Sequence, residues 1–114
     1  MKTTRTLIIT AAALLAGTTI AFAEPIVGNW KTQSGETAKI AKCGGSYCIQ
    51  LVTGKYSGQR IGKMSGNGGS YNGTITDPAD GKEYSGSAKV TGSKMSLKGC
   101  ALKIFCKTQK WNKL

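Results

Sequence analysis

Apolar and polar residues alternate along most of the chain after residue 23, and this period of two predicts β-strands. In residues 82–90, small and apolar residues occupy the even positions from Tyr84 to Val90, and polar residues occupy the odd ones. We expect further strands at residues 27–32, 37–43, 47–53, 71–77, 95–99 and 105–113, and a short one at 60–64 between mobile loops. Because no segment of this part has apolar residues at helical spacing, an all-β fold is predicted.

The turn at residues 77–81 predicts how the neighbouring strands pair. Pro78 restricts φ and Gly81 can adopt a positive φ, which suits a tight turn. Pairing residue 76 with 83, and residue 90 with 95 in the next hairpin, aligns three glycines across the sheet: Gly73, Gly86 and Gly99. These glycines either let the sheet bend and close or form the floor of a ligand pocket.

Seven to eight short antiparallel strands are expected to form a small closed or nearly closed barrel. Closure protects the exposed edges of a glycine-rich sheet. It also brings the first and last strands together. Trp30 and Trp111 are therefore predicted to lie on neighbouring strands.

The first 23 residues have the pattern of a signal peptide. Lys2 and Arg5 form a positive region, residues 7–20 are mainly apolar, and Ala21-Phe22-Ala23 resembles a cleavage site. The alternative is a membrane anchor, but the apolar run is shorter than the roughly twenty residues that span a bilayer. We expect cleavage after Ala23, a periplasmic or secreted protein, and a single domain from residue 24 to residue 114.

The four cysteines are expected to form structural disulfides. An exported protein meets an oxidising compartment, where an even number of thiols normally pairs. Of the three possible pairings, the short spacings favour Cys43–Cys48 and Cys100–Cys106. A zinc site of four thiolates is the alternative, but four and five residues separate these cysteines, against the usual two to four.

The composition argues against catalysis. The chain has no histidine and only five Asp and Glu residues, so a Ser-His or Cys-His couple and a histidine zinc site are excluded. The clustered carboxylates Asp77, Asp80 and Glu83 lie in or beside the predicted turn, where Asx-type hydrogen bonds explain the aspartates. We therefore expect no catalytic centre, no metal and no cofactor.

The positive charge of the chain suggests an anionic partner. Sixteen Lys and Arg against five Asp and Glu give a net charge of +11. Cleavage of the leader would remove Lys2 and Arg5 and leave +9. Such a field attracts phosphates, acidic glycans or anionic lipid headgroups outside the cytoplasm, whereas nucleic acid does not fit an exported protein. The alternative is a solvated surface that keeps a monomer soluble. The candidate anion-binding residues are Lys39, Lys42, Arg60, Lys63, Lys107 and Lys110.

Several ordered motifs point to a family. They comprise a Gly-x-Trp opening, a Cys-Gly-x-x-x-Cys segment, an Asp-Pro-x-Asp-Gly-Lys block and a Gln-x-Trp ending; outside the cysteines, their residues are Gly28, Trp30, Asp77, Pro78, Gly81, Lys82, Gln109 and Trp111. In these motifs the chain resembles the bacterial family catalogued as domain of unknown function 2147, small exported proteins with a lipocalin-like barrel. The resemblance implies a lipocalin-like (calycin-like) fold and an extracytoplasmic location, and it does not imply an activity.

A lipocalin-like barrel suggests a small apolar or amphiphilic ligand. An eight-stranded barrel can hold one small molecule, or its side chains can fill the interior. The candidate lining residues are Trp30, Tyr47, Ile49, Tyr71, Ile75, Tyr84 and Leu97. For most of them we favour packing in the core. The first functional hypothesis is therefore a non-enzymatic binder of such a ligand, and the second is a cationic protein that binds anionic envelope components, including a membrane surface.

Overall fold

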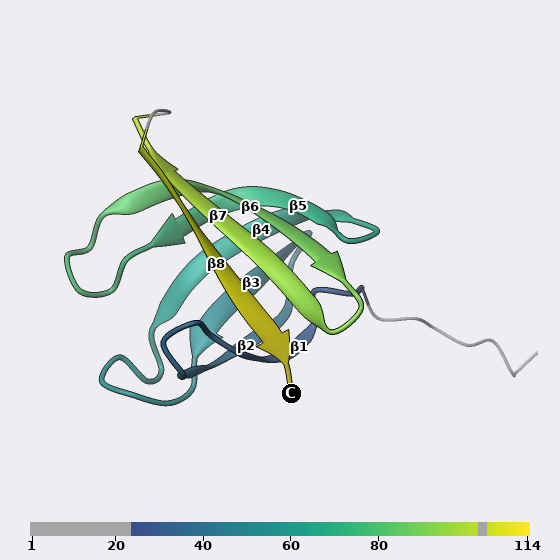
Figure 1. The fold of residues 1–114 in the computed structure, drawn as a ribbon, viewed down its shortest axis with the longest axis horizontal. Helices are drawn as coiled ribbons and strands as arrows, with labels where there is room; N and C mark the ends of the chain where they lie inside the picture. Colours follow the sequence, from purple (N-terminus) through teal and green to yellow (C-terminus); the bar gives the residue numbers. More distant parts are fainter. Residues whose placement is uncertain (1–23, 103–104) are drawn as a thin grey trace, which may run out of the picture.

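The chain forms a closed antiparallel barrel of eight strands (Figure 1). The computed structural model describes residues 24–102 and 105–114, so the predicted signal peptide lies outside the described residues. The strands are β1 (Gly28–Lys31), β2 (Thr37–Cys43), β3 (Ser46–Leu51), β4 (Arg60–Asn67), β5 (Ser70–Thr76), β6 (Glu83–Thr91), β7 (Lys94–Ala101) and β8 (Phe105–Lys113). Each strand pairs with the next, and β1 also pairs with β8. The predicted all-β closed barrel is confirmed.

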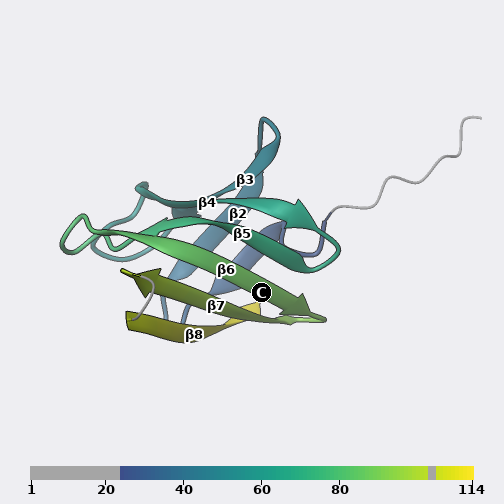
Figure 2. The ribbon, with the colours of Figure 1, turned by 90° about the horizontal axis from the view of Figure 1, so that it is seen from above.

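The predicted strand pairing is also confirmed. Ile75 lies opposite Tyr84, and Gly86 lies between Gly73 and Gly99. Figure 2 shows how β5, β6, β7 and β8 follow one another around one side of the barrel. The two tryptophan-bearing strands are neighbours, because β1 and β8 form the final seam. That seam is short, since its register consists of two pairs, Trp30 with Lys113 and Lys31 with Asn112.

The strand predicted at residues 60–64 is longer than expected, and the mobile loop expected after it is wrong. Strand β4 runs to Asn67 and pairs with β5 from Gly62 to Asn67. Gly66 has a φ of 147°, and a Cβ at this position would lie 2.9 Å from the Cα of Tyr71. Glycine here therefore allows two strands to approach closely rather than making a flexible loop.

The inner faces of the strands pack into one apolar core. Its largest fully buried side chains are those of Trp30, Tyr71, Ile26, Ile40, Ile49, Met64 and Met95. Two of the three aligned glycines accommodate this packing. A Cβ at Gly73 would lie 2.8 Å from the Cα of Met64, and a Cβ at Gly86 would lie 2.7 Å from Cδ1 of Ile75. These two glycines therefore let the sheet curve tightly around the core.

Residues 24–27 seal one end of the barrel, the end that holds the β2–β3, β4–β5 and β6–β7 turns. Ile26 is fully buried, and its carbonyl accepts a hydrogen bond from Nε1 of Trp30 at 2.9 Å. The Glu24 carboxylate accepts one hydrogen bond from the Gly68 amide and another from the Tyr71 hydroxyl, both at 2.9 Å. Burial, and then the bond to Glu24, raise the pKa of Tyr71 above its usual value near 10, so the hydroxyl stays protonated as a donor.

One disulfide lies at each end of the barrel. Cys43–Cys48 spans the β2–β3 turn at the sealed end, and Cys100–Cys106 joins directly opposite residues of β7 and β8 near the other end. The predicted pairing is thus present. Disulfides form and persist in oxidising compartments, so the two bonds favour a location outside the cytoplasm.

Removing either disulfide is expected to weaken the fold moderately. Each bond closes a short loop, for which chain entropy gives a loss of about 2 kcal/mol in the free energy of unfolding when both cysteines become serine. Urea denaturation of each double variant would measure the loss, and a peptide map without reductant would identify the bonds. A map that joins Cys43 or Cys48 to Cys100 or Cys106 would contradict the pairing.

Candidate functional site

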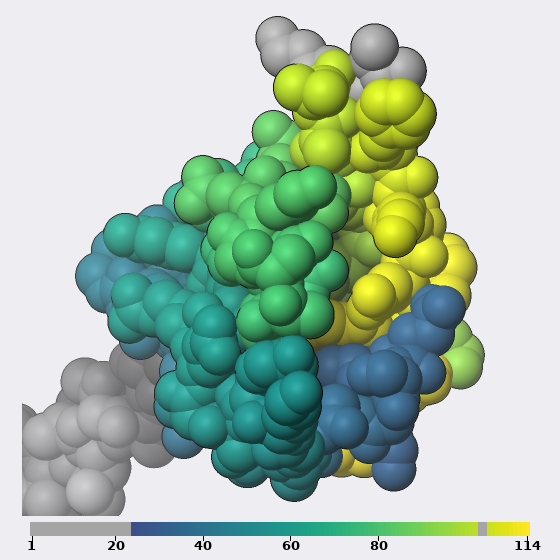
Figure 3. Space-filling model, turned by 90° about the vertical axis from the view of Figure 1, so that its left-hand side faces the viewer, coloured from purple at the N-terminus to yellow at the C-terminus, as the bar shows by residue number. Residues whose placement is uncertain are grey.

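The end of the barrel opposite residues 24–27 is open. The loops β1–β2, β3–β4 and β5–β6 meet there with the beginning of β8. Figure 3 faces this end, where the β5–β6 loop (green), β8 (yellow) and the β1–β2 loop (blue) surround a recess. Two adjoining cavities occupy the recess.

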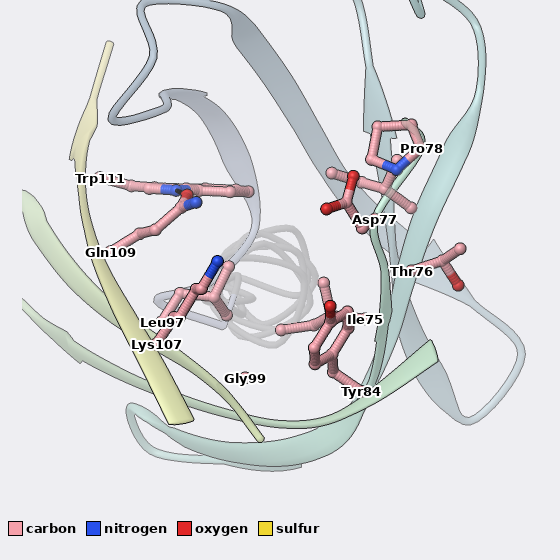
Figure 4. Close-up of a pocket in the computed structure, with 11 residues that line it drawn as sticks. Ile75, Thr76, Asp77, Pro78, Tyr84, Leu97, Gly99, Lys107, Gln109 and Trp111 are labelled. Atoms are coloured by element: carbon pink, nitrogen blue, oxygen red, sulfur yellow. Dashed lines mark hydrogen bonds between the residues drawn. The ribbon is translucent and has the colours of Figure 1, made fainter. Parts of the chain in front are cut away.

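The first cavity, of about 210 Å³, lies between two apolar walls (Figure 4). Ile75 and Tyr84, from the paired strands β5 and β6, form one wall. Leu97 and Trp111, from β7 and β8, form the facing wall and are nearly completely buried. Gly99 also borders the cavity, and a Cβ there would meet no atom closer than the Cβ of Tyr84 at 3.6 Å. Of the three aligned glycines, only this one borders the space.

Three polar side chains border the same space. Lys107 and Gln109 come from the inward-facing row of β8 that ends in Trp111, and Asp77 comes from the start of the β5–β6 loop. In Figure 4 the Lys107 ammonium and the Asp77 carboxylate approach the space from opposite walls. Oε1 of Gln109 accepts a hydrogen bond from Nε1 of Trp111 at 2.9 Å, which holds the indole in place.

The second cavity, of about 280 Å³, adjoins the first. The two share Ile61, Pro78, Gln109 and Trp111. Its remaining lining comes from the β1–β2 and β3–β4 parts of the chain: Thr32, Ser34, Glu36, Leu51, Thr53, Lys55 and Tyr56. Trp111 therefore borders both cavities and lies where they adjoin.

The seven residues proposed from sequence to line a pocket divide into two groups. Ile75, Tyr84 and Leu97 border the first cavity. The others pack towards the sealed end: Trp30, Ile49 and Tyr71 are buried in the core, and the half-buried ring of Tyr47 stands edge-on to Tyr71 with 5.8 Å between centroids.

The sequence interpretation missed other members of the lining. The sequence analysis does not propose Ile61, Thr76, Gln109 or Trp111 as lining residues, although all four border the first cavity. The signal was present in β8, where positions 107, 109 and 111 alternate with outward-facing residues. Extending the inner-face assignment to this strand would have found them.

The six proposed anion-binding residues do not form one cluster. They lie on β2, β4 and β8. Lys39 and Lys63 are exposed on separate strands, and Lys107 alone borders the first cavity. Lys110 lies among other lysines on the outer side of β8, beside Ser96.

The side chains at the open end offer apolar and polar contact surfaces. Within residues 24–102 and 105–114, no three His, Cys, Asp or Glu residues are grouped to hold a metal ion. Asp77 and Asp80 each accept a backbone hydrogen bond inside their own turn, from Ala79 and from Lys82 respectively. The described part of the chain also contains no helix of the length and hydropathy needed to traverse a bilayer.

Residues 58–113 match the model of the family described as "Uncharacterized protein conserved in bacteria (DUF2147)", which confirms the resemblance seen in the motifs. No curated protein and no solved structure matches the chain. The matched segment includes strands β4 to β8 and every residue that borders the first cavity. The second cavity also uses residues outside this segment.

Proposed function

We propose that this protein binds a small apolar or amphiphilic molecule in the first cavity, without catalysing a reaction on it. The observation that carries the proposal is an apolar-walled cavity at the open end of a barrel whose other end is sealed. Pockets for small molecules are concave and largely apolar, with a few placed polar groups. Ile75 and Leu97, with Lys107 at the edge, supply that combination.

The size and edge chemistry favour an amphiphile over a fully enclosed hydrocarbon. The cavity of about 210 Å³ is smaller than the roughly 300–1,000 Å³ typical of sites for drug-sized ligands. The apolar part of a ligand would enter between Tyr84 and Trp111, and its polar part would remain at the edge. There Lys107 can pair with an anionic group, and Asp77 or Gln109 can accept or donate a hydrogen bond.

The absence of histidine from the sequence and the engagement of Asp77 and Asp80 in their turn support a binding role. We also propose that the protein acts in the periplasm or after secretion. The predicted signal peptide and the two disulfides support this location.

Two fluorescent probes of similar shape test the polar edge of the site. N-phenyl-1-naphthylamine is neutral, and 1-anilinonaphthalene-8-sulfonate carries an anionic group. Lys107→Gln is expected to weaken binding of the anionic probe about three- to fivefold, because an exposed ion pair contributes up to about 1 kcal/mol, and to leave the neutral probe unaffected. Lys39→Gln makes the same charge change on an exposed position of β2 and is expected to affect neither probe.

Filling the cavity tests its apolar part. Gly99→Leu places a side chain in the open space and is expected to abolish binding of both probes. Gly45→Leu is the matched control, because a Cβ at Gly45 has no atom within 4 Å and lies at the sealed end. Thermal melting of both variants monitors folding. Failure of the wild-type protein to bind either probe, or unchanged binding by folded Gly99→Leu, would contradict the proposal.

A further inference from the structure

The β7–β8 hairpin carries an exposed apolar tip. In Figure 1 the end of β7 and the start of β8 project beyond the rest of the barrel. Leu102 is 82% exposed and Phe105 is 68% exposed, whereas most large apolar residues in the described ranges are buried. Solvent-exposed apolar side chains at one projecting point are typical of an interaction site.

A disulfide joins the two strands immediately before this tip. Cys100 and Cys106 are directly opposite each other in the ladder and are bonded immediately below the tip. Leu102 and Phe105 are each within two residues of a bonded cysteine. The bond therefore keeps the ends of β7 and β8 together when the hairpin binds.

Lysines cover the outer face of the same hairpin below the disulfide. Along β7, Lys94 and Lys98 lie on either side of Ser96. Across the sheet, Ser96 pairs with Lys110 of β8 and with Lys89 of β6. The Lys110 ammonium donates a hydrogen bond to the Ser96 hydroxyl at 3.2 Å. These four lysines are hereafter the lysine cluster.

The acidic residues near this face are few. On the outward-facing positions of β6, β7 and β8, the one carboxylate is Glu83, at the start of β6. Asp77 and Asp80 belong to the β5–β6 loop, where each is bonded to its own turn. The outer face of the hairpin is therefore strongly cationic below an apolar tip.

We propose that this hairpin docks the protein on a membrane surface that carries anionic phosphate headgroups. Leu102 and Phe105 enter the interface, Lys98 contacts the phosphates, and Lys110, farther from the tip, adds to the electrostatic attraction. Peripheral membrane binding combines buried apolar area with attraction to anionic lipid, and either contribution alone is weak. Lys98 lies four residues from Leu102, roughly 13 Å along the strand, and its flexible stem can extend towards the headgroups.

The apolar tip distinguishes a membrane from a soluble polyanion. An acidic glycan would use the lysine cluster but would gain nothing from Leu102 and Phe105. A bilayer interface accommodates both the apolar tip and the lysines. The tip enters the apolar part, and the lysines below the disulfide face the headgroups. This docking surface is separate from the first cavity, so the inference stands without the proposed ligand.

Vesicle co-sedimentation of the purified, oxidised protein tests the inference. Wild-type protein is expected to bind vesicles of phosphatidylethanolamine and phosphatidylglycerol, with an affinity that falls as salt is added, and not vesicles of phosphatidylcholine. The double variant Leu102→Ser with Phe105→Ser is expected to bind about tenfold more weakly, because two apolar side chains no longer enter the interface. Lys98→Gln with Lys110→Gln is expected to lose about tenfold as well.

Two matched double variants serve as controls. Val52→Ser with Leu114→Ser removes two exposed apolar side chains from other places, and Lys39→Gln with Lys63→Gln removes two charges from β2 and β4. Both are expected to bind as the wild type does. The wild-type protein and all variants begin at the same N-terminal residue. Any difference in vesicle binding therefore comes from the substituted residues.

A fluorescent variant tests insertion of the tip directly. Trp30 and Trp111 are buried and give a constant background, so Phe105→Trp is expected to shift its emission to shorter wavelength only with anionic vesicles. Unchanged emission, unchanged binding by the tip variant, or equal losses in the controls would overturn the inference. Wild-type binding to polygalacturonate but not to vesicles would also overturn it, in favour of a soluble polyanion.

Discussion

Trp30→Ala is expected to lower the free energy of unfolding by about 3–5 kcal/mol, the range for truncating a large buried aromatic side chain. Trp30 is fully buried, and its Nε1 donates to the Ile26 carbonyl. It also lies on β1, which closes the barrel against β8 through two register pairs. Its loss would leave a cavity at the shortest seam and release the segment that seals the end. A domain of this size has a marginal core, so the variant is expected to be largely unfolded at room temperature.

Trp30→Phe separates the packing contribution from the hydrogen bond. It keeps a large aromatic ring but cannot donate to Ile26, so we expect a loss of about 1–3 kcal/mol, set mainly by the unpaired carbonyl. Circular dichroism and urea denaturation of both variants measure the effects, with Val52→Ala as an exposed control. A Trp30→Ala protein as stable as the wild type would show that this side chain does not support the seam.

The sequence predicted strand pairing well where alternation and turn chemistry agreed. Residues 77–81 form a turn in which Asp77 and Asp80 accept bonds from backbone amides. Because side chains in a strand alternate with a period of two, one correct pair fixes the faces of the whole hairpin. This explains why Ile75 opposite Tyr84, and Gly86 opposite Gly99, could be predicted without coordinates.

Which end of the barrel is closed could not be predicted in the same way. Tyr71 and Tyr84 both face inwards, yet Tyr71 is buried against Glu24 at the sealed end and Tyr84 borders the first cavity. The difference depends on where residues 24–27 fold over the barrel. That segment has no period-two pattern, so the sequence did not show which end it would close.

The location of the positive charge on the surface could not be predicted from the composition alone, for a related reason. The chain-wide excess of lysine predicts an attractive field but not its location. Lys94 and Lys110 come together beside Ser96 only through the pairing of β7 with β8. Cys100 lies directly opposite Cys106 in that pair, so the disulfide predicted between them could have set the register and located the lysine cluster.

Two substitutions in the row of aligned glycines are expected to change the free energy of unfolding by very different amounts. At Gly73, an added Cβ would lie 2.8 Å from the Met64 Cα and 2.9 Å from the Lys63 carbonyl carbon. These are backbone atoms of β4, so the ladder between β4 and β5 would have to separate. Gly73→Ala is therefore expected to lower the free energy of unfolding by about 3 kcal/mol, the upper part of the usual range for overpacking.

Gly99→Ala is the matched substitution in the same row. Its Cβ would meet only Tyr84, whose Cβ lies at 3.6 Å, an ordinary contact at the edge of the first cavity. We expect a change within about 0.5 kcal/mol, as for substitutions that disturb no packing. Urea denaturation of the two variants under the same conditions compares them directly. Equal losses would contradict the division of this row into glycines that bend the sheet and one that leaves room for a ligand, because both would then act through sheet curvature alone.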